Sequence, residues 1–591
     1  MASAHFDSGA RARGRLIGLI RTFLRTHARR LGVIAVLQAL QAAGNLYLPG
    51  LNADIINNGV VKADLGHIGR AGGTMLAITV VLCLASLGSL RLSSWVSMSV
   101  GADIRTAVHD RVQSFSVAEL NRFGIASLTT RSVNDVQQVQ LFLQVALSLL
   151  VIAVVTTLGA VVLAVRQEPG LTLLLVATLA AILAVTGWVV VRLLPMFHAV
   201  QVRTDGLNQV LREQISGVRV ARAFLRTDWE EDRFRRANAG ITETTLRADR
   251  VFALVIPVVM GITNLSSVGV FWFGGKLVAG GSMPIGNLIA FLLYILQILL
   301  YVGIGVTVVI LLPRAAASAE RIQQVLSTVP AIADPPQPVL PDVATGAVEF
   351  RHVSFGYAGS ERPVLNDLTF AFRPGQTNAI LGGTGSGKTT LLSLIPRFLD
   401  ATSGAVLVNG VEVPAQSAER LRAGIGLVPQ TAFLFAGTVA GNLRFGRPEA
   451  TEEELWRALG IAQASEFVAG LPGQLDARVD RGGANLSGGQ RQRLSIARAL
   501  VRRPSLYLFD DCFSALDAAT DARLRAALPT GTGGATVVVV AQRASTVMNA
   551  DQIIVLDAGN IAGIGTHPQL LADCRTYQSI VASQLGSGAA A

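Results

Sequence analysis

Residues 378–389 read NAILGGTGSGKT and decide the fold of the C-terminal half of this chain. The apolar run Asn378 to Leu381 has the composition of a buried strand, and a helical run, Thr390 to Phe398, follows the glycine-rich turn. The turn fits the pattern G-x-x-x-x-G-K-[ST], in which backbone N–H groups and a helix N-terminus surround phosphate oxygens. The stretch therefore predicts an α/β nucleotide-binding domain with a phosphate loop.

Two side chains at the end of this loop predict its ligands. Lys388 is placed to reach the β and γ phosphates of ATP, and Thr389 offers a hydroxyl group to Mg²⁺. Lysine is scarce in the chain, which has only Lys62, Lys276 and Lys388 among 50 basic residues. A lysine that persists in so arginine-rich a sequence favours a position that needs a compact ammonium group.

A second strand-like run in this half, Ser505 to Asp511, ends in two carboxylates. Asp510 is placed to hold the Mg²⁺ of a bound nucleotide, as a Walker B aspartate does. A buried strand capped by solvated acids is the alternative, and the phosphate loop favours the metal site. Strand-like and helix-like segments alternate from about Thr345 onward, as expected of an α/β domain.

The N-terminal half has the composition of a membrane protein. The 591 residues are 51% hydrophobic and only 15% charged, with a mean hydropathy of +0.49, which excludes a disordered chain and a wholly soluble one. Uncharged apolar runs of about 20 residues are long enough to cross a bilayer as helices. Six such runs occur: Leu31 to Leu48, Ala71 to Leu90, Leu141 to Val165, Gly170 to Val191, Val251 to Gly275 and Ile285 to Leu312.

Arginine is distributed unevenly between the loops. It is abundant before the first run and in the long loops after the second and fourth, whereas the other loops hold little more than Lys62, Arg70, Arg166 and Lys276. By the positive-inside rule, the arginine-rich loops and both termini are cytoplasmic. The net charge of +11 therefore reflects topology, and no nucleic-acid partner is expected. The first run has no cleavage site at its end and is expected to be retained.

The composition also predicts the boundaries of the domains. Four prolines between Ala331 and Pro341 indicate a linker. We expect a six-helix transmembrane domain over 1–328, a linker over 329–345, a nucleotide-binding domain over 346–585 and a flexible tail over 586–591. Two amphipathic stretches, Ser116 to Phe123 and Gly217 to Trp229, mark the cytoplasmic turning points, where an ordinary solvated turn is equally compatible with the sequence. The three cysteines fit no metal or disulfide pattern.

A third motif connects these features to a known family. Leu486 to Gln490 read LSGGQ, and a helical run follows. The chain resembles an ATP-binding cassette (ABC) half-transporter of the exporter type (type IV), in which six membrane helices precede one cassette. The membrane half resembles that family at Leu48 to Ile56. The resemblance implies an ATPase that drives transport in a bacterial cell membrane, with the N-terminus and the cassette in the cytoplasm.

The resemblance also assigns roles to single residues. It implies that Tyr357 stacks on adenine, that Gln430 approaches Mg²⁺ and the attacking water, and that LSGGQ contacts ATP held by an opposing cassette. The two turning points become coupling helices. The implied ATP-binding residues are Tyr357, Gly382, Gly385, Ser386, Gly387, Lys388, Thr389, Thr390 and Asp510, with Thr389, Gln430 and Asp510 around Mg²⁺. The implied signature and D-loop residues are Leu486, Ser487, Gly488, Gly489, Gln490, Ser514 and Asp517.

Two positions depart from the family pattern. Asp511 stands where the family has a catalytic glutamate, and Gln542 where it has a histidine. Aspartate is one methylene shorter, so its carboxylate is expected to fall short of the attacking water, and glutamine lacks the proton chemistry of histidine. The sequence therefore predicts a slow ATP site in this chain, with Asp511, Gln542 and Gln430 as its catalytic positions, and an intact signature that completes a partner's site.

The expected assembly is a heterodimer with a second half-transporter that exports small amphipathic drugs or lipids. Uncharged polar groups in the spans could contact such a substrate or hold helices together: Gln38, Gln41, Asn45, Gln140, Gln144 and Gln297. The open alternatives are a homodimer with two weakened sites, an importer of siderophores, vitamins or lipids with the same membrane fold, and a regulatory subunit that senses ATP.

Overall fold

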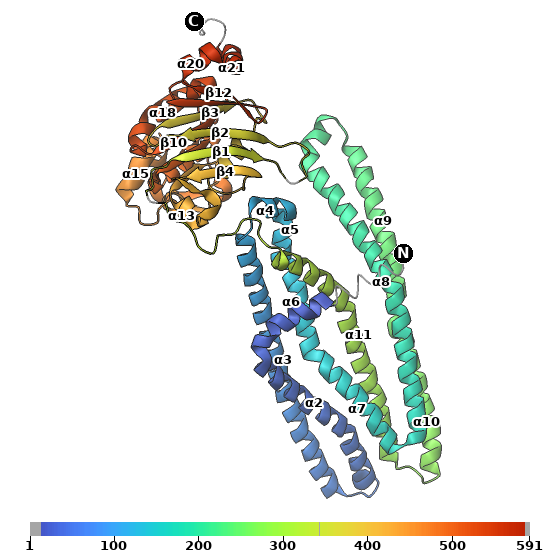
Figure 1. Ribbon diagram of the computed structural model, residues 1–591. Coiled ribbons are helices and arrows are strands. Elements are labelled where there is room, and N and C mark those ends of the chain that lie inside the picture. The colour runs from blue at the N-terminus through green and yellow to red at the C-terminus, as the bar shows by residue number, and fades with distance from the viewer. Residues whose placement is uncertain (1–13, 342, 358, 586–591) are drawn as a thin grey trace. The chain divides into compact units, whose positions relative to one another are not determined.

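The computed structural model describes residues 14–341, 343–357 and 359–585 (Figure 1). Within them the chain forms two compact units, one of residues 14–114 and 123–328 and the other of residues 115–122 and 329–585. The first unit is entirely helical, and the second contains all the described strands.

Six helical segments of the first unit are long and apolar enough to span a membrane. Each contains one of the six predicted runs, so the predicted spans are confirmed. The segments are Gly14–Val60, Leu65–Gln113, Ile125–Gln167, Pro169–Ala223, Thr227–Ala279 and Ile285–Ser327. Their individual helices are α2 (Ala28–Asp54), α3 (Leu65–Gln113), α5 (Ile125–Thr130), α6 (Val136–Val145), α7 (Val151–Gln167), α8 (Pro169–Ala223), α9 (Thr227–Ala253), α10 (Val255–Ala279) and α11 (Ile285–Ser327).

Local signals start and interrupt these helices. Asp64 caps α3 by accepting a hydrogen bond from the backbone N–H of His67 at 2.9 Å, and Pro169 occupies the first turn of α8. Among the described residues, a π-helical turn ends the first span at Ile55–Val60, and two more interrupt the third, at Arg131–Asp135 and Ala146–Leu150. The extra residue in each of the latter two rotates the face that the following helix presents.

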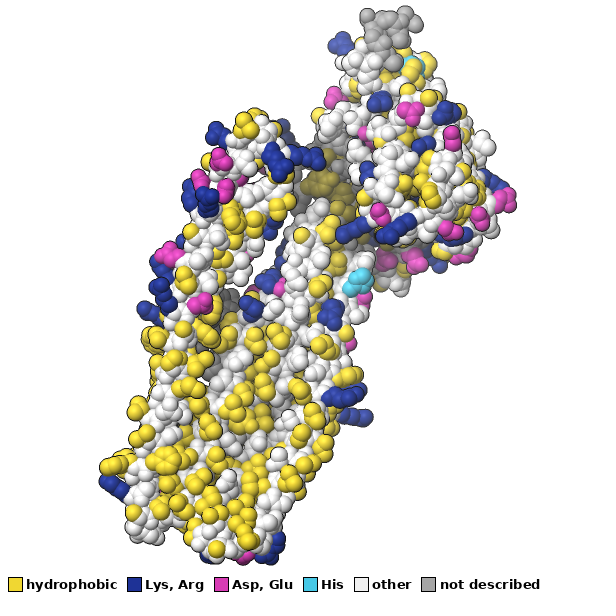
Figure 2. Space-filling view, turned by 180° about the vertical axis from the view of Figure 1, so that it is seen from behind, with side chains coloured by type: hydrophobic (Ala, Val, Ile, Leu, Met, Phe, Trp, Pro, Cys, Tyr) yellow, Lys and Arg dark blue, Asp and Glu magenta, His cyan; other side chains and the backbone are white. Residues whose placement is uncertain are grey.

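The surface of the helical unit is apolar over much of its length. Figure 2 shows hydrophobic side chains covering the helices, with most Lys and Arg side chains gathered toward the ends. Leu76, Leu158, Leu173 and Leu265 are all more than 60% exposed. So large a continuous apolar surface is stable only against lipid, so this unit is the membrane domain.

The two cytoplasmic turning points differ in structure. The first contains a separate short helix, α4 (Val117–Phe123), in which Glu119 accepts a hydrogen bond from the backbone N–H of Ala331 at 3.1 Å. At the second, α8 runs on to Ala223 and α9 begins at Thr227, so the stretch from Gly217 forms no separate helix. At the second turning point the implied coupling helix is therefore not a separate helix, and the open alternative of an ordinary turn between two helices describes the stretch.

An ion pair with a buried carboxylate joins the third and sixth spans. The side chain of Asp135 is 3% exposed and accepts hydrogen bonds from Arg321 Nε at 2.7 Å and from Ser318 Oγ at 3.0 Å. Arg131, one turn earlier, donates to the backbone carbonyl of Arg321 at 3.1 Å. These contacts fix the π-helical turn of the third span against α11.

Replacing Arg321 with methionine should therefore destabilise the membrane domain, because Asp135 is left buried without its cation. We expect a loss of roughly 1–3 kcal/mol, less than for a fully buried pair because Arg321 is half exposed. The double variant D135N/R321M should recover part of this loss in thermal unfolding of the detergent-solubilised protein. A double variant no more stable than R321M would contradict the ion-pair assignment.

The second unit is built around a six-stranded sheet in the order β12-β11-β3-β10-β9-β6. Its strands are β3 (Thr377–Gly382), β6 (Ile425–Val428), β9 (Leu506–Asp510), β10 (Thr536–Ala541), β11 (Gln552–Asp557) and β12 (Asn560–Gly565). All neighbours are parallel except β12 against β11. The carboxyl ends of β3, β10, β9 and β6 therefore lie side by side at one edge, where α/β proteins bind ligands.

The remaining elements cover this sheet. An antiparallel sheet has the order β2-β1-β4-β5, and β7 pairs with β8. These strands are β1 (Val348–Phe355), β2 (Leu365–Phe372), β4 (Ser403–Val408), β5 (Val411–Glu412), β7 (Gly437–Thr438) and β8 (Arg478–Val479). The helices are α12 (Lys388–Leu394), α13 (Ala418–Ala423), α14 (Val439–Arg444), α15 (Glu452–Ile461), α16 (Ser465–Ala469), α17 (Gly488–Arg502), α18 (Ala518–Thr532), α19 (Ala544–Val547), α20 (His567–Asp573) and α21 (Arg575–Leu585).

Both faces of the central sheet are buried. Tyr507 and Phe509 belong to one apolar cluster, and Leu508, between them on β9, belongs to the other. Successive side chains of a strand point to opposite faces, so a strand covered on both sides reads as a continuous hydrophobic run. This explains why β9 could be located from the sequence.

Candidate functional site

The phosphate loop connects β3 to α12 and is shaped by glycine. Gly387 has φ +97°, and a Cβ atom on Gly382 would lie 2.4 Å from the carbonyl oxygen of Leu556. Lys388 is 7% exposed, and its Nζ donates to the carbonyls of Gly382 at 2.9 Å and Gly383 at 2.6 Å. Burial lowers the pKa of Lys388, and the nearby charges of Asp511 and Asp510 oppose that change. The ammonium group is thus held at the centre of the loop.

Two of the three predicted Mg²⁺ ligands, Thr389 and Asp510, lie together beside this loop, and the third, Gln430, bonds to Asp511. The hydroxyl of Thr389, on the first turn of α12, donates to Oδ1 of Asp510, at the end of β9, at 3.1 Å. Burial raises the pKa of Asp510, and the charge of Asp511 raises it further. Within the described residues no cluster of three or more His, Cys, Asp or Glu side chains could hold a metal. Mg²⁺ commonly uses one carboxylate together with phosphate oxygens, and this pair fits that role.

Asp511 is the residue on which three loops converge. Its Oδ2 accepts hydrogen bonds from Nε2 of Gln542, after β10, at 2.9 Å and from Nε2 of Gln430, after β6, at 3.4 Å. Asp511 has φ +44°, a left-handed conformation that aspartate tolerates better than most residues. Burial raises its pKa, against the effects of Lys388 and the two glutamines. The structure thus brings all three predicted catalytic positions together.

Gln542 also contacts the phosphate loop. The hydroxyl of Thr384 donates to its Oε1 at 3.5 Å.

The predicted adenine-stacking residue, Tyr357, is 49% exposed, and its hydroxyl lies 3.1 Å from Oγ1 of Thr390 on α12. An exposed aromatic ring fixed to the helix that starts at the phosphate loop is suitable for stacking on a base.

The LSGGQ motif forms the N-terminus of α17 as a capping box. Ser487 Oγ accepts from the N–H of Gln490 at 3.3 Å, and Oε1 of Gln490 accepts from the N–H of Ser487 at 2.9 Å. Leu486 is buried, whereas Ser487 and Gly488 are exposed. The motif therefore presents an exposed helix N-terminus that can hold an anion. Among the described side-chain hydrogen bonds, none joins it to the phosphate loop.

The D-loop lies between these two regions. Ser514 Oγ donates to the carbonyl of Asp511 at 2.8 Å, and Asp517 caps α18 by accepting from the N–H of Thr520 at 2.9 Å. Gly489 of the signature is within 4 Å, at its ideal Cβ position, of Ala515 and Leu516. The predicted residues thus form two groups, one around the phosphate loop and one around α17.

A cavity of about 440 Å³ opens beside Asp511. Its walls come from the phosphate loop, the D-loop, the loop after β10 and α21: Gly382, Gly383, Thr384, Asp511, Ser514, Gln542, Arg543, Ile580, Ser583 and Gln584. The sequence does not predict that α21 lines this cavity. Its helical pattern indicates which residues are buried but carries no signal for the loop that the helix contacts.

The polar residues of the spans mostly join helices. Gln38 donates to the carbonyl of Ser148 at 3.1 Å, Asn45 to the hydroxyl of Tyr301 at 2.9 Å, and Gln297 to the carbonyl of Asn45 at 2.8 Å. Gln144 donates to Ser94 at 3.4 Å, and Gln140 to the sulfur of Met98 at 2.7 Å, whereas Gln41 bonds within its own helix. Of the two roles left open for these groups, helix packing accounts for most of their contacts.

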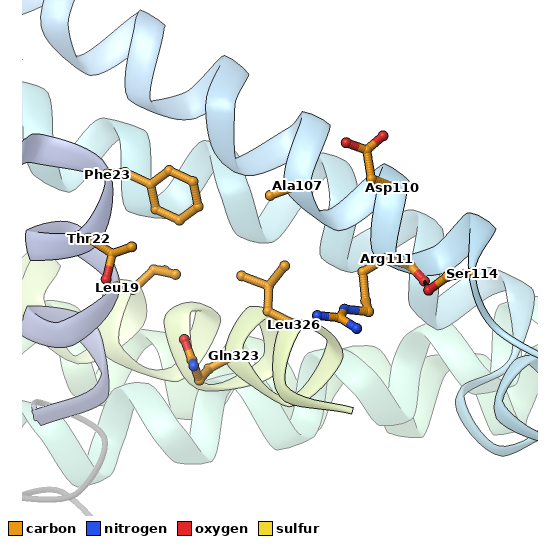
Figure 3. A pocket seen from close by; sticks show the side chains of 9 residues that line it. All are labelled: Leu19, Thr22, Phe23, Ala107, Asp110, Arg111, Ser114, Gln323 and Leu326. Atoms are coloured by element: carbon orange, nitrogen blue, oxygen red, sulfur yellow. Dashed lines mark hydrogen bonds between the residues drawn. The ribbon is translucent and has the colours of Figure 1, made fainter. Parts of the chain in front are cut away.

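A separate cavity of about 500 Å³ lies in the helical unit (Figure 3). Leu19 and Phe23, from the helix at residues 14–24, face Ala107 of α3 and Leu326 of α11, while polar groups such as Arg111 and Gln323 lie along its edge. It contains none of the residues predicted from sequence. The nucleotide chemistry is confined to the second unit.

Replacing Asp510 with asparagine tests two separate effects of this side chain. One is its role in binding Mg²⁺, and the other is the stability lost by burying its charge. The amide keeps the acceptor for Thr389 and removes a buried charge that is disfavoured, because burial raises the carboxyl pKa. Between the ordinary and the raised pKa the folded state binds more protons than the unfolded state, so this carboxyl lowers stability as pH rises through that interval.

We therefore expect D510N to raise the apparent Tm without nucleotide at neutral pH by about 2 °C, and to abolish the further rise that Mg²⁺-ATP gives the parent protein. Differential scanning fluorimetry at pH 7 measures both. An unchanged Mg²⁺-ATP shift in D510N would contradict the metal role.

Two family models match the chain. The model described as the ABC transporter transmembrane region matches residues 31–302, and the model described as ABC transporter matches residues 365–514. An uncharacterized ABC transporter ATP-binding protein of Mycobacterium tuberculosis is 45% identical over 573 residues, covering 96% of this chain and 98% of the relative.

Two further similarities are informative. A fatty acid ABC transporter ATP-binding/permease protein of Mycobacterium bovis is 34% identical over 514 residues, covering 87% of this chain and 81% of the relative. The solved structure of a bacterial Atm1-family ABC exporter with ATP bound superposes with a TM-score of 0.80, covering 96% of this chain and 99% of the other at 24% identity. At that identity the structure supports the fold alone.

Proposed function

Because the chain belongs to the ABC transporter family, whose ATPase domains drive transport across the membrane, we propose that it is one half of an asymmetric exporter. ABC exporters work as dimers, and this chain is a multi-pass plasma-membrane protein with a cytoplasmic ATPase domain. In the proposed assembly a different half-transporter supplies the active ATP site. This chain supplies a slow ATP site and the signature that completes its partner's site.

The chain's own residues are arranged to bind ATP. The phosphate loop and the ammonium group of Lys388 would hold the β and γ phosphates, and Tyr357 would stack on the base. Thr389 and Asp510 would hold Mg²⁺, which neutralises phosphate charge when bound. The exposed N-terminus of α17 provides a second anion site, which the partner's γ-phosphate would occupy when the cassettes close on ATP.

The environment of Asp511 carries the proposal of asymmetry. A base must come within about 2.6–3.2 Å of the proton that it removes. The carboxylate of Asp511 is about 1.5 Å shorter in reach than a glutamate, and its Oδ2 is engaged by Gln542 and Gln430. Gln542 has no titratable proton at neutral pH. By contrast, the capping box of Ser487 and Gln490 is complete.

One effect opposes slow turnover at Asp511 and keeps the homodimer as the second candidate. Burial raises the pKa of Asp511, which makes it a stronger base than an exposed aspartate. A stronger base still requires contact with its proton. The short reach and the occupied Oδ2 favour slow turnover at this site.

The proposed substrate class is small amphipathic molecules such as lipids or drugs. The spans use uncharged polar groups, most of which bond between helices, so few polar side chains in the spans are left to contact a substrate. The similarity to a protein named as a fatty acid transporter points in the same direction.

Variants in this chain alone can test the asymmetry. S487A removes a hydroxyl that would contact the partner's ATP and should lower ATPase activity of the assembled transporter at least ~10-fold. D511A should leave activity within about twofold of the parent, because the slow site contributes little turnover. A linked-enzyme ATPase assay on complex purified from native membrane measures both. A D511A variant without turnover, or an S487A variant with full turnover, would contradict the proposal.

The composition of the purified complex gives an independent test. We expect mass spectrometry of the gently extracted, tagged chain to find a second half-transporter in stoichiometric amount. A species made of two copies of this chain alone would favour the homodimer. Vesicle transport assays with fluorescent fatty acids and hydrophobic dyes would then test the substrate class.

A further inference from the structure

The C-terminal helix α21 contacts the backbone of the loop that carries Gln542. Oε1 of Gln584 accepts a hydrogen bond from the N–H of Ala544 at 2.7 Å, and Nε2 of Gln584 donates to the carbonyl of Gln542 at 2.8 Å. One side-chain amide thus binds the two backbone groups on either side of Arg543. It pairs with this loop in the way that the peptide group of a neighbouring strand would.

The helix that carries Gln584 is firmly anchored. Tyr577 and Val581 are 0% and 1% exposed, and both pack in the apolar cluster that contains Ile553 and Val555 of β11. Residues 577, 581 and 584 are spaced by four and three positions, so they lie on one face of α21. The core of the domain therefore fixes the backbone of α21, from which the exposed side chain of Gln584 reaches the loop.

The loop that it holds carries a side chain that contacts the phosphate loop. The side chain of Gln542 donates to Oδ2 of Asp511 at 2.9 Å and accepts from Thr384 of the phosphate loop at 3.5 Å. Ile580, Ser583 and Gln584 line the same cavity as these residues. A shift of the loop backbone would move the Gln542 side chain away from both contacts.

We propose that Gln584 is a positioning residue for ATP binding: it clamps the backbone on both sides of Arg543 and thereby fixes Gln542 between Asp511 and the phosphate loop. The inference rests on the proposed function only in that the phosphate loop binds ATP. It requires neither a heterodimer nor a particular substrate. It also gives α21 a role in the nucleotide site beyond packing.

Hydrogen–deuterium exchange of the full-length protein, in the assembly with which it purifies, tests the clamp directly. The variant Q584M keeps the length of the side chain and removes both hydrogen bonds. We expect exchange of the peptide covering 541–548 to rise by roughly tenfold without nucleotide, because the N–H of Ala544 loses its partner. Q584E keeps an acceptor for Ala544 but loses the donor to Gln542, so its exchange should rise less.

A matched control lies on the same helix. Gln578 also donates to backbone carbonyls, those of Leu571 at 2.7 Å and Ala572 at 3.2 Å, but these belong to α20. Q578M should leave exchange of 541–548 unchanged. The second readout is the ATP concentration that gives half-maximal protection of the phosphate-loop peptide, which Q584M should raise several-fold and Q578M should not.

Three results would overturn the proposal. They are unchanged exchange of 541–548 in Q584M, an unchanged half-maximal ATP concentration, and an increase spread equally over α21 and β11, which would indicate only loosened packing. The exchange measured without nucleotide does not depend on turnover at Asp511. A working base at Asp511 would therefore contradict the proposed function and leave this result unaffected.

Discussion

A single carboxylate oxygen, Oδ2 of Asp511, connects the loops that end three neighbouring strands. The loop after β9 provides the carboxylate, and the loops after β10 and β6 provide the amides of Gln542 and Gln430 that donate to it. This arrangement is possible because β10, β9 and β6 are adjacent and parallel, so their carboxyl ends meet at one edge of the sheet. The phosphate loop leaves β3, the next strand in the same order. The nucleotide site is thus a consequence of strand order.

The two anion sites of this cassette lie on different elements. Lys388 and the phosphate loop form one, and the capped N-terminus of α17 forms the other. In the proposed assembly, a nucleotide held by the first site would be completed by the second site of another cassette, so ATP would bridge two chains. On this proposal, the aspartate at 511 and the glutamine at 542 would affect only the first site, whereas the capping box of Ser487 and Gln490 would serve the partner. One chain would then lack rapid turnover at its own site and still be needed for turnover at the partner's.

Much of this site could be predicted from the sequence because its chemistry depends on local spacing. The glycines around Lys388, the two carboxylates after a hydrophobic strand and the Ser487-to-Gln490 spacing each act within a few residues, as did the six apolar runs of the membrane domain. The pairing of Asp135 with Arg321 and the contact of Gln584 with the loop after β10 join residues far apart in the chain. Their partners depend on tertiary packing, which has no periodic signature.

The second turning point shows a different limit of prediction from sequence. The sequence between Gly217 and Trp229 has the amphipathic pattern of a short helix, yet its residues extend α8 and α9. A helical pattern fixes which face is apolar but does not fix where one helix ends and the next begins. For the spans, likewise, the sequence located Gln38 and Asn45 but could not distinguish a group that contacts substrate from one that bonds to a neighbouring helix.

The central claim is that the ATP site of this chain binds nucleotide and turns it over slowly. Its most direct test is a cryo-electron microscopy structure of the purified transporter during steady-state turnover with Mg²⁺-ATP. The account predicts intact ATP beside Lys388 and Asp511 of this chain, and ADP at the site built on the partner's phosphate loop. ADP at both sites in equal proportion, between two copies of this chain, would contradict it.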